Sequence, residues 1–359
     1  MKIEIITIHD PDVNYGSTLQ SCGTFNFIKN LGYNVEIINY RPNYKSTLQR
    51  LKRKLINLLF YKDSFIRRKK INSYFSKYAN LSKQYNSYDE LFNDPPVAEV
   101  YITGSDVIWN KDVNPEGADS AYYLGFVKNG ICMSYAPSMG EIQPAENILF
   151  IKKQISDFKF ISVREELSKK QLINAGINNV YCTIDPVFLL DRSYYEEQVT
   201  ENKYGEYTLV YLMTGNKTKR KKVNDITCEY GSIVIGFGGF KQKCDCNKYI
   251  RDAGVEDFLS LIYYAKHIVT DSFHCICFSL IFEKQFLYLP SVDSSMRIEN
   301  ILSYVNLENR IIMPHSSGEF PKNEIDYEIV RPLLFEKILY SRKFLECSLA
   351  ECKKECLCN

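Results

Sequence analysis

The first forty residues combine two buried strand patterns with a helix between them, and this arrangement restricts the fold more than any other feature. Residues 2–8 and 35–40 predict strands, and residues 17–30 between them carry apolar side chains at helical spacing. Gly32 ends the helix. A helical crossover of this length joins strands that run parallel. The sequence therefore predicts an α/β fold built on a parallel sheet.

The same pattern continues and then restarts after residues 191–206, which have the polar composition of an interdomain linker. With 359 residues and roughly 150 residues per domain, two domains are expected. We predict an N-terminal Rossmann-like domain over 1–195, a C-terminal one over 200–340 and a Cys-rich tail over 341–359. Further strands are expected at 97–103, 131–136, 159–163, 180–184, 207–213, 232–237, 267–270 and 286–289, and helices at 165–174, 255–265, 271–282 and 297–305. Such sheets bind ligands at the carboxyl ends of their strands, so the cleft between the domains is the expected site.

One segment is strongly basic although the whole chain is nearly neutral, with 45 Lys and Arg against 43 Asp and Glu. Between Arg41 and Lys77 there are twelve basic residues and one acid, Asp63. Leucines at helical spacing here predict a basic helical insertion over about 41–90. Such a helix can lie on an anionic membrane through 41–77, or its leucines can pack on the first domain with the charges in solvent. The net charge of +2 gives no argument for a nucleic-acid partner.

Twelve cysteines are many for this chain, and four of them crowd its end: Cys347, Cys352, Cys356 and Cys358. Their spacing does not match a paired Cys-x-x-Cys zinc site, so free thiols on a C-terminal helix are the favoured interpretation and a soft-metal site is the alternative.

The N-terminus lacks the apolar run of a signal peptide, and no stretch approaches the roughly 20 apolar residues that span a bilayer. We expect a cytoplasmic protein.

Two side chains close after predicted strands, His274 and Arg164, are the strongest candidates for chemistry. His274 lies in the first turn of the helix after residues 267–270, where it can act as a general acid or base or serve as a structural histidine. Arg164 stands where a strand becomes a helix. Its guanidinium can hold a phosphate or a carboxylate, or pair at the surface with Glu165 or Glu166.

Other candidates lie in the loops after strands, where helix N-termini favour anionic ligands. Trp109, the only tryptophan, can stack on a sugar or fill the core. Residues 236–239 lack the spacing of a glycine-rich phosphate loop and are interpreted as a turn. The candidate acceptor or cleft residues are Asn14, Tyr15, Gly16, Gln20, Ser105, Asp106, Trp109, Ser138 and Asp271.

Six short segments occur in a specific order between about residues 10 and 300: 14–20 (NYGSTLQ), 104–110 (GSDVIWN), 134–140 (SYAPSMG), 161–166 (ISVREE), 185–190 (DPVFLL) and 269–274 (VTDSFH). Together they resemble the polysaccharide pyruvyl transferase family. The resemblance implies two Rossmann-like domains facing a cleft, in a GT-B-like fold. It also implies transfer of the enolpyruvyl group of phosphoenolpyruvate to a sugar of a bacterial polysaccharide or lipid-linked glycan, forming a pyruvate ketal and releasing phosphate. Phosphoenolpyruvate is then a co-substrate, and neither a metal nor a cofactor is implied.

The resemblance also implies roles for single residues. His274 matches the family's proton donor, and Arg164 matches the position that holds the donor's phosphate or carboxylate. Some members carry Arg-Leu-His where this chain has Ser272, Phe273 and His274. Ser272 and Phe273 would then line the donor site, and Arg297 would supply the missing cation. Two alternatives remain open: a glycosyltransferase of GT-B-like fold that uses a nucleotide sugar, and a non-catalytic family member that binds glycan.

Overall fold

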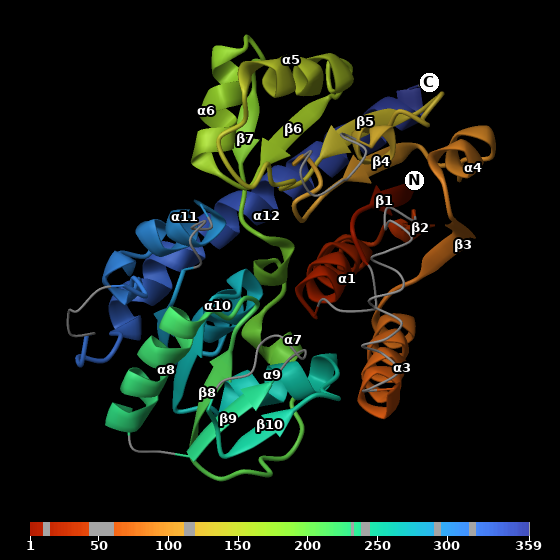
Figure 1. Cartoon of the computed structure of the whole chain (residues 1–359). Coiled ribbons are helices and arrows are strands. Elements are labelled where there is room, and N and C mark those ends of the chain that lie inside the picture. The colour runs from red at the N-terminus through yellow and green to blue at the C-terminus, as the bar shows by residue number, and fades with distance from the viewer. Residues whose placement is uncertain are drawn as a thin grey trace.

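The computed structural model describes residues 1–9, 15–42, 61–110, 119–230, 233–237, 245–290, 296–315 and 321–358. Within these residues the strands form two separate parallel sheets, one of seven strands and one of five (Figure 1). The chain passes from the first sheet to the second through residues 183–206. This arrangement confirms the predicted α/β fold.

The larger sheet belongs to the first half of the chain and has the order β3-β2-β1-β4-β5-β6-β7. All of its neighbouring strands pair in parallel. The strands are β1 (Lys2–Ile6), β2 (Asn34–Tyr40), β3 (Leu81–Tyr85), β4 (Val100–Thr103), β5 (Ile131–Ser134), β6 (Phe160–Val163) and β7 (Val180–Cys182). The order reverses between β1 and β4, and parallel sheets bind ligands beside such a reversal.

The predicted basic insertion over about 41–90 is only partly helical. Its described part contains α3 and then β3, which pairs with β2 at the edge of the sheet. The strand pattern is weak there because Lys83 and Gln84 are exposed on this edge. The leucine repeat at 48–59 lies outside the described residues. The helices of this half are α1 (Tyr15–Asn30), α3 (Tyr61–Tyr78), α4 (Tyr88–Asn93), α5 (Ala145–Gln154), α6 (Glu166–Asn174) and α7 (Arg192–Glu196), with the 3-10 helices η2 (Ser120–Tyr123) and η3 (Pro186–Phe188).

The smaller sheet belongs to the second half and has the parallel order β10-β9-β8-β11-β12. Its strands are β8 (Tyr207–Tyr211), β9 (Ile233–Phe237), β10 (Lys248–Ile250), β11 (His267–Thr270) and β12 (Gln285–Tyr288). The helices are α8 (Lys217–Tyr230), α9 (Val255–Tyr264), α10 (Phe273–Ile281), α11 (Met296–Tyr304) and α12 (Tyr327–Cys358), with the 3-10 helix η5 (Glu308–Arg310). No helix within the described residues is long and apolar enough to cross a membrane.

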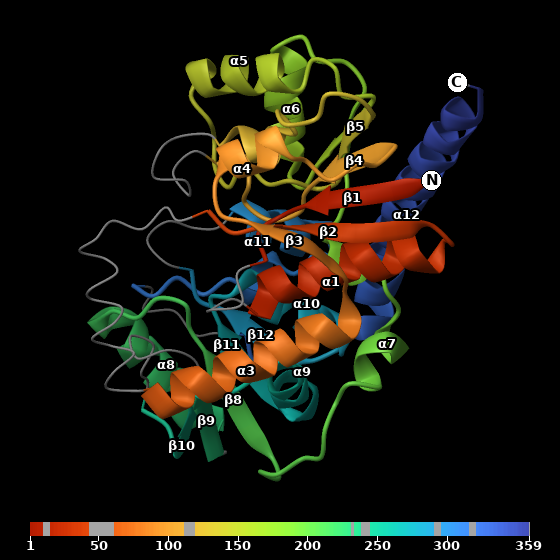
Figure 2. The same cartoon turned by 90° about the vertical axis from the view of Figure 1, so that its right-hand side faces the viewer.

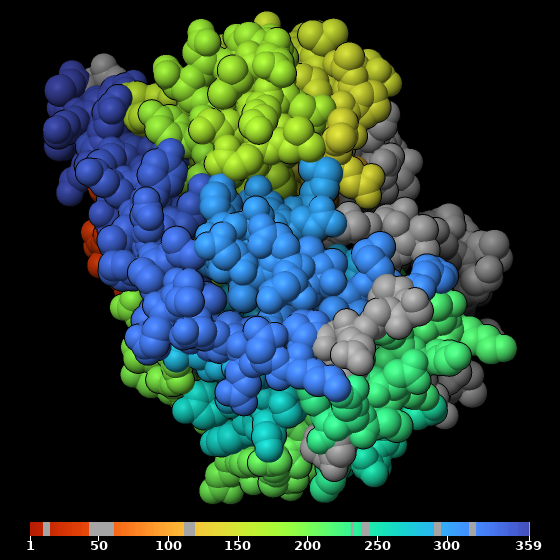
Figure 3. Space-filling view, turned by 90° about the vertical axis from the view of Figure 1, so that its left-hand side faces the viewer, coloured from red at the N-terminus to blue at the C-terminus, as the bar shows by residue number. Residues whose placement is uncertain are grey.

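The last helix, α12, begins in the second half and runs back alongside the first (Figure 2). Ser341 Oγ accepts a hydrogen bond of 2.9 Å from the backbone N–H of Ile184, and the ring of Phe344 packs against that of Tyr181. Figure 3 shows this blue segment lying across both halves. The boundary predicted at residue 341 therefore falls inside a continuous helix, and residues 341–358 pack on the first half instead of forming a separate tail.

The two halves share one hydrophobic core that extends from the first sheet through α1 into the second half. Tyr15, the first residue of α1, stacks on Phe258 of α9 with ring centroids 5.1 Å apart. Helix α1 also contacts α10, which follows β11. Because of this packing, the loops after strands of the first sheet meet the helix that follows a strand of the second.

Candidate active site

Arg164 and Asp185 form a buried ion pair at the carboxyl ends of two neighbouring strands. Arg164 follows β6 and Asp185 follows β7, and the guanidinium nitrogen Nη2 lies 3.0 Å from Asp185 Oδ2. The same nitrogen donates a hydrogen bond to Ser105 Oγ. Burial acts to raise the pKa of Asp185, but Arg164 and His274 outweigh it and lower that pKa to about 2. The carboxylate therefore stays charged at neutral pH.

Arg164 uses only part of its hydrogen-bonding capacity within the described residues. Its Nη2 donates a hydrogen bond to Ser105 and forms the ion pair with Asp185, and its Nε donates to the Ala136 carbonyl at 3.4 Å. Its Nη1 is buried and has no hydrogen-bond partner there. An unpaired buried donor costs about 1–3 kcal/mol, so this nitrogen is suited to an oxygen of an anionic ligand. The surface ion pair considered from the sequence is excluded, because Arg164 is buried.

His274 faces the same carboxylate from the second half. It lies in the first turn of α10, which Ser272 caps by accepting a hydrogen bond of 3.4 Å from Cys275 N. The imidazole Nε2 lies 3.6 Å from Asp185 Oδ2. The other ring nitrogen, Nδ1, packs so closely on α1 that a Cβ added to Gly16 would lie 1.9 Å from it. Glycine at position 16 is therefore required for this position of the ring.

Phe273 contacts two guanidinium groups that come from different halves of the molecule. The Cζ of Arg164 lies 5.2 Å from the ring centroid and the Cζ of Arg297 lies 5.3 Å from it, both within cation–π range. Arg297 is in the first turn of α11, with Nη1 3.8 Å from Asp106 Oδ1. Burial, and then the charge of Arg164, lower the pKa of Arg297, although an arginine remains charged. The structure thus brings Arg164, Arg297 and His274 together.

Three predicted cleft residues shape the loops beside these side chains. Gln20 on α1 accepts a hydrogen bond of 3.3 Å from Ser105 N and donates one of 2.8 Å to Thr7 Oγ1. Ser138 N donates to the Asp106 carbonyl at 2.8 Å. All three of Gln20, Ser105 and Ser138 are fully buried. They position the loops after β1, β4 and β5. These hydrogen bonds join the three residues to other protein groups.

Three other predicted cleft residues have side chains engaged elsewhere. Trp109 is 1% exposed and fills the core of the first half, so the sugar-stacking role is not open to it. Asp271 pairs with the buried Lys219, with 2.6 Å between Oδ2 and Nζ. Tyr15 is buried against Phe258 between the two halves. These residues are therefore structural in this conformation.

Asp185 was not among the residues expected at the site, although it begins one of the six sequence segments. A signal was present, because an Asp-Pro pair directly follows a short predicted strand and so lies at the ligand-binding edge of a parallel sheet.

The expected turn at 236–239 is described only in part, since Gly236 and Phe237 end β9. Asn14 lies outside the described residues.

The sequence profile of one family, described as polysaccharide pyruvyl transferase, matches residues 14–294. The chain belongs to this family. The matched region of this pyruvyl transferase family member includes Arg164, Asp185 and His274, whereas Arg297 lies three residues beyond it. No curated protein sequence matches the chain.

Solved structures similar to this pyruvyl transferase family member include two UDP-N-acetylglucosamine 2-epimerases. The enzyme from Rickettsia bellii is 10% identical, with a TM-score of 0.52 over 99% of this chain and 97% of that one. The putative enzyme from Listeria monocytogenes is 9% identical, with a TM-score of 0.52 over 96% and 90%. The S. aureus MnaA-UDP co-structure is 11% identical, with a TM-score of 0.52 over 95% and 90%. At these identities the similarity shows the fold alone, and it confirms two Rossmann-like domains facing a cleft in a GT-B-like arrangement.

The terminal cysteines of this family member lie on α12, as the expected C-terminal helix requires. Cys352 is buried whereas Cys347 and Cys358 are exposed, so the thiols point to different sides of the helix. The cysteines among the described residues are free. In the same part of the chain, no group of three or more His, Cys, Asp or Glu side chains is arranged to hold a metal ion.

Proposed function

We propose that this protein transfers the enolpyruvyl group of phosphoenolpyruvate to a sugar of a bacterial polysaccharide or lipid-linked glycan and closes it to a cyclic pyruvate ketal. The observation that carries the proposal is the contact of both Arg164 and His274 with the carboxylate of Asp185, with Nη1 of Arg164 unpaired. A cation with a free donor beside a histidine suits an anionic substrate that must be protonated. The family match supports the same class of reaction.

The two arginines that contact Phe273 suit the two anionic groups of phosphoenolpyruvate. Its phosphate oxygen and its carboxylate are attached to the same carbon, C2, so the anionic groups lie close together. In the proposed complex Nη1 of Arg164 binds one of them and Arg297 binds the other. Arg164 and His274 are only 4% and 6% exposed, so the donor enters while the two halves are apart. Closure then excludes water from the reaction.

The proposed chemistry begins with His274 donating a proton to C3, the methylene carbon, which makes C2 an oxocarbenium-like electrophile. A sugar hydroxyl adds to C2 and returns its proton to His274. A second hydroxyl of the sugar then attacks C2 while the bond from C2 to the phosphate oxygen breaks. The bonding electrons leave with the phosphate, which takes up the proton of the second hydroxyl. One phosphoenolpyruvate and two hydroxyls thus give one ketal and one phosphate.

Asp185 acts as a positioning residue in this mechanism. Its charge faces Nε2 of His274 at 3.6 Å and Nη2 of Arg164 at 3.0 Å, so one carboxylate orients both side chains. A buried carboxylate has this effect only while it is ionised, and the low pKa of Asp185 maintains that state at neutral pH.

Thermal stabilisation by phosphoenolpyruvate tests the donor without any acceptor. We expect the wild type and Arg220→Gln, which changes an exposed arginine of α8, to be stabilised. Arg164→Gln is expected to lose the shift, measured against the melting temperature of that variant without ligand. Stabilisation by UDP-N-acetylglucosamine and not by phosphoenolpyruvate would contradict the proposal and favour the nucleotide-sugar alternative. Stabilisation by neither ligand would contradict it too.

The proposed enzyme meets lipid-linked acceptors at the cytoplasmic face of a membrane through α3. Tyr61 and Phe65 on this helix are 66% and 56% exposed, and their rings pack together at 6.0 Å. Lys62 and Lys69 are exposed on the same helix. Exposed aromatic rings beside cations suit the interface of an anionic bilayer.

Co-sedimentation with vesicles tests the membrane contact. Vesicles that contain phosphatidylglycerol should bind the wild type, and the double variant Tyr61→Ser with Phe65→Ser should lose this binding. Phe335→Ser, which changes an exposed aromatic residue of α12, should keep it. Equal binding of the double variant and the wild type would contradict a role of α3.

A further inference from the structure

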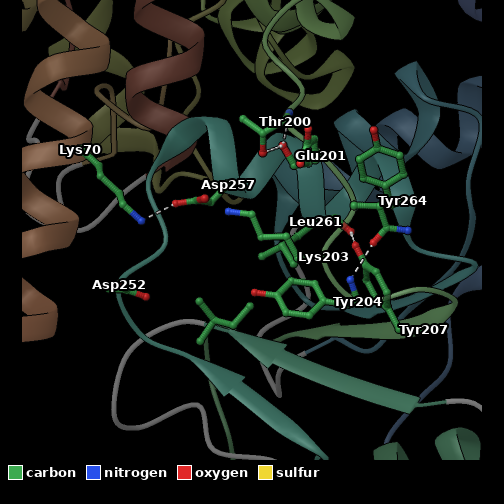
Figure 4. Close-up of a pocket in the computed structure, with 13 residues that line it drawn as sticks. Lys70, Thr200, Glu201, Lys203, Tyr204, Tyr207, Asp252, Asp257, Leu261 and Tyr264 are labelled. Carbon is green, nitrogen blue, oxygen red and sulfur yellow. Dashed lines mark hydrogen bonds and ion pairs between the residues drawn. The ribbon is translucent and has the colours of Figure 1, made fainter.

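A cavity of about 190 Å³ lies where α3 of the first half meets the second half (Figure 4). Residues 200–204 line it together with side chains of α9 and with Lys70, Tyr207, Ile250 and Asp252. Lys70 closes one side through an ion pair with Asp257, with 2.8 Å between Nζ and Oδ2. Neither arginine of the proposed donor site lines this cavity, and nor does the histidine.

Several polar groups of the cavity are unused among the described residues. Asp252, Glu201 and Lys203 make no hydrogen bond or ion pair there, and the hydroxyl of Tyr204 has no partner there either. Figure 4 shows the Tyr204 hydroxyl and the Lys203 amine pointing into the cavity, with Asp252 at its far wall. Asp257, by contrast, also accepts a 2.8 Å hydrogen bond from the backbone at position 254. The free groups include both donors and acceptors.

This set of groups suits a neutral, hydroxyl-rich ring. Two amines and three carboxylates line the cavity, so a phosphate would meet three like charges. An apolar chain would leave the same groups desolvated and unpaired. A sugar hydroxyl both donates and accepts hydrogen bonds, and the carbon face of a sugar ring can pack on Ile250, Leu261 and the ring of Tyr204.

We propose that this cavity binds a neutral pyranose unit of the acceptor glycan, distinct from the unit that receives pyruvate. Naming the glycan as an acceptor rests on the proposed function. The cavity is linked to the transfer site through Tyr15, whose hydroxyl donates a 2.9 Å hydrogen bond to the carbonyl of Ala253, next to Asp252. Tyr15 precedes Gly16, which packs on the ring of His274. The wall of the cavity and the ring of His274 thus both contact the start of α1.

Saturation-transfer difference NMR with methyl glycosides of glucose, galactose, mannose and N-acetylglucosamine tests the cavity. At least one glycoside is expected to bind, and Asp252→Ala combined with Tyr204→Phe should weaken that binding about tenfold through lost hydrogen bonds. The matched control is Glu206→Gln, an exposed carboxylate that pairs with Lys266 outside the cavity. Binding that the double variant leaves unchanged would place the sugar elsewhere and overturn the proposal. Absence of binding by every glycoside would overturn it too.

A separate measurement distinguishes failure of this inference from failure of the proposed function. The double variant Asp252→Ala with Tyr204→Phe should keep the full thermal shift with phosphoenolpyruvate, because neither residue belongs to the donor site. A lost glycoside signal with an unchanged donor shift supports the cavity. A glycoside signal that depends on the cavity, in a protein that phosphoenolpyruvate does not stabilise, would keep the sugar site and contradict only the proposed donor.

Discussion

The hydroxyl of Tyr304 donates a hydrogen bond of 2.7 Å to Glu166 Oε1 and so joins α11 of the second half to α6 of the first. Lys337 Nζ donates to the same hydroxyl at 2.8 Å. Burial acts to raise the pKa of Glu166, but Tyr304 and Lys337 outweigh it and lower that pKa. Helix α11 begins beside Arg297 and α6 begins two residues after Arg164, so in this closed arrangement the contact sets the separation of the two arginines.

Tyr304→Phe should therefore weaken the closed arrangement. The variant loses a donor to a carboxylate that is still partly exposed, and we expect its free energy of unfolding in urea to fall by about 1 kcal/mol. Tyr181→Phe is the control, because that hydroxyl has no hydrogen bond among the described residues. Equal stability of the two variants would show that the contact does not hold the halves together.

Gly16→Ala should abolish turnover without unfolding the protein. The added Cβ would lie 1.9 Å from Nδ1 of His274, so the imidazole must leave its place beside Asp185. We expect kcat to fall by about 100-fold or more, because the proton donor is displaced. The control is Asn30→Ala at the exposed end of the same helix. A Gly16→Ala enzyme with normal kcat would contradict the assigned position of His274.

His274→Gln should separate donor binding from chemistry. Binding of phosphoenolpyruvate should persist because Arg164 and Arg297 remain, whereas phosphate release with candidate sugar-lipids should fall by about 10²–10⁴-fold. His315→Gln, which changes an exposed histidine, should behave as the wild type. Unchanged phosphate release by His274→Gln would remove this residue from the catalytic role.

Glu4 should make stability depend on pH. This residue of β1 is fully buried, and burial raises its pKa from 4.5 to about 7 although Lys2 opposes the change. The folded chain then binds the proton more tightly than the unfolded chain, so the stabilisation present below pH 4.5 is lost as the pH rises to about 7. Glu4→Gln should be about 3 kcal/mol more stable than wild type near pH 8 and nearly equal to it near pH 4.5.

Denaturant unfolding at both pH values measures this difference in the free energy of unfolding. The control is Glu36→Gln, because Glu36 also pairs with Lys2 but is partly exposed. If the free energies of unfolding of Glu4→Gln and wild type differ by the same amount at the two pH values, the pKa of Glu4 is not raised on folding.

The parts of the fold and site that local patterns determine were predictable from the sequence. The predicted strand 267–270 coincides with β11, because its β-branched residues Ile268, Val269 and Thr270 favour a strand that is buried on both faces. Arg164 was predictable because it directly follows a strand, and His274 because it lies in the first turn of the helix after one. A parallel sheet places each position at the ligand-binding edge of its own sheet, and the packing of α1 on α10 brings the two edges together.

Features that depend on distant contacts were not predictable in the same way. Asp185 Oδ1 accepts a hydrogen bond of 3.0 Å from Val187 N, which is the ordinary capping role of an Asp before Pro. Its other oxygen faces Arg164 and His274, and no local pattern indicates that contact. Helix α12 was divided at residue 341 because its cysteines suggested a separate tail, whereas its packing on the first half sets its length.

A crystal structure determined with phosphoenolpyruvate tests the central claim most directly. The account predicts that a phosphate or carboxylate oxygen lies within hydrogen-bonding distance of Nη1 of Arg164, the group left unpaired within the described residues. It also predicts that C3 faces the imidazole of His274. Phosphoenolpyruvate bound away from Arg164, or bound there with C3 turned away from His274, would contradict the proposed mechanism.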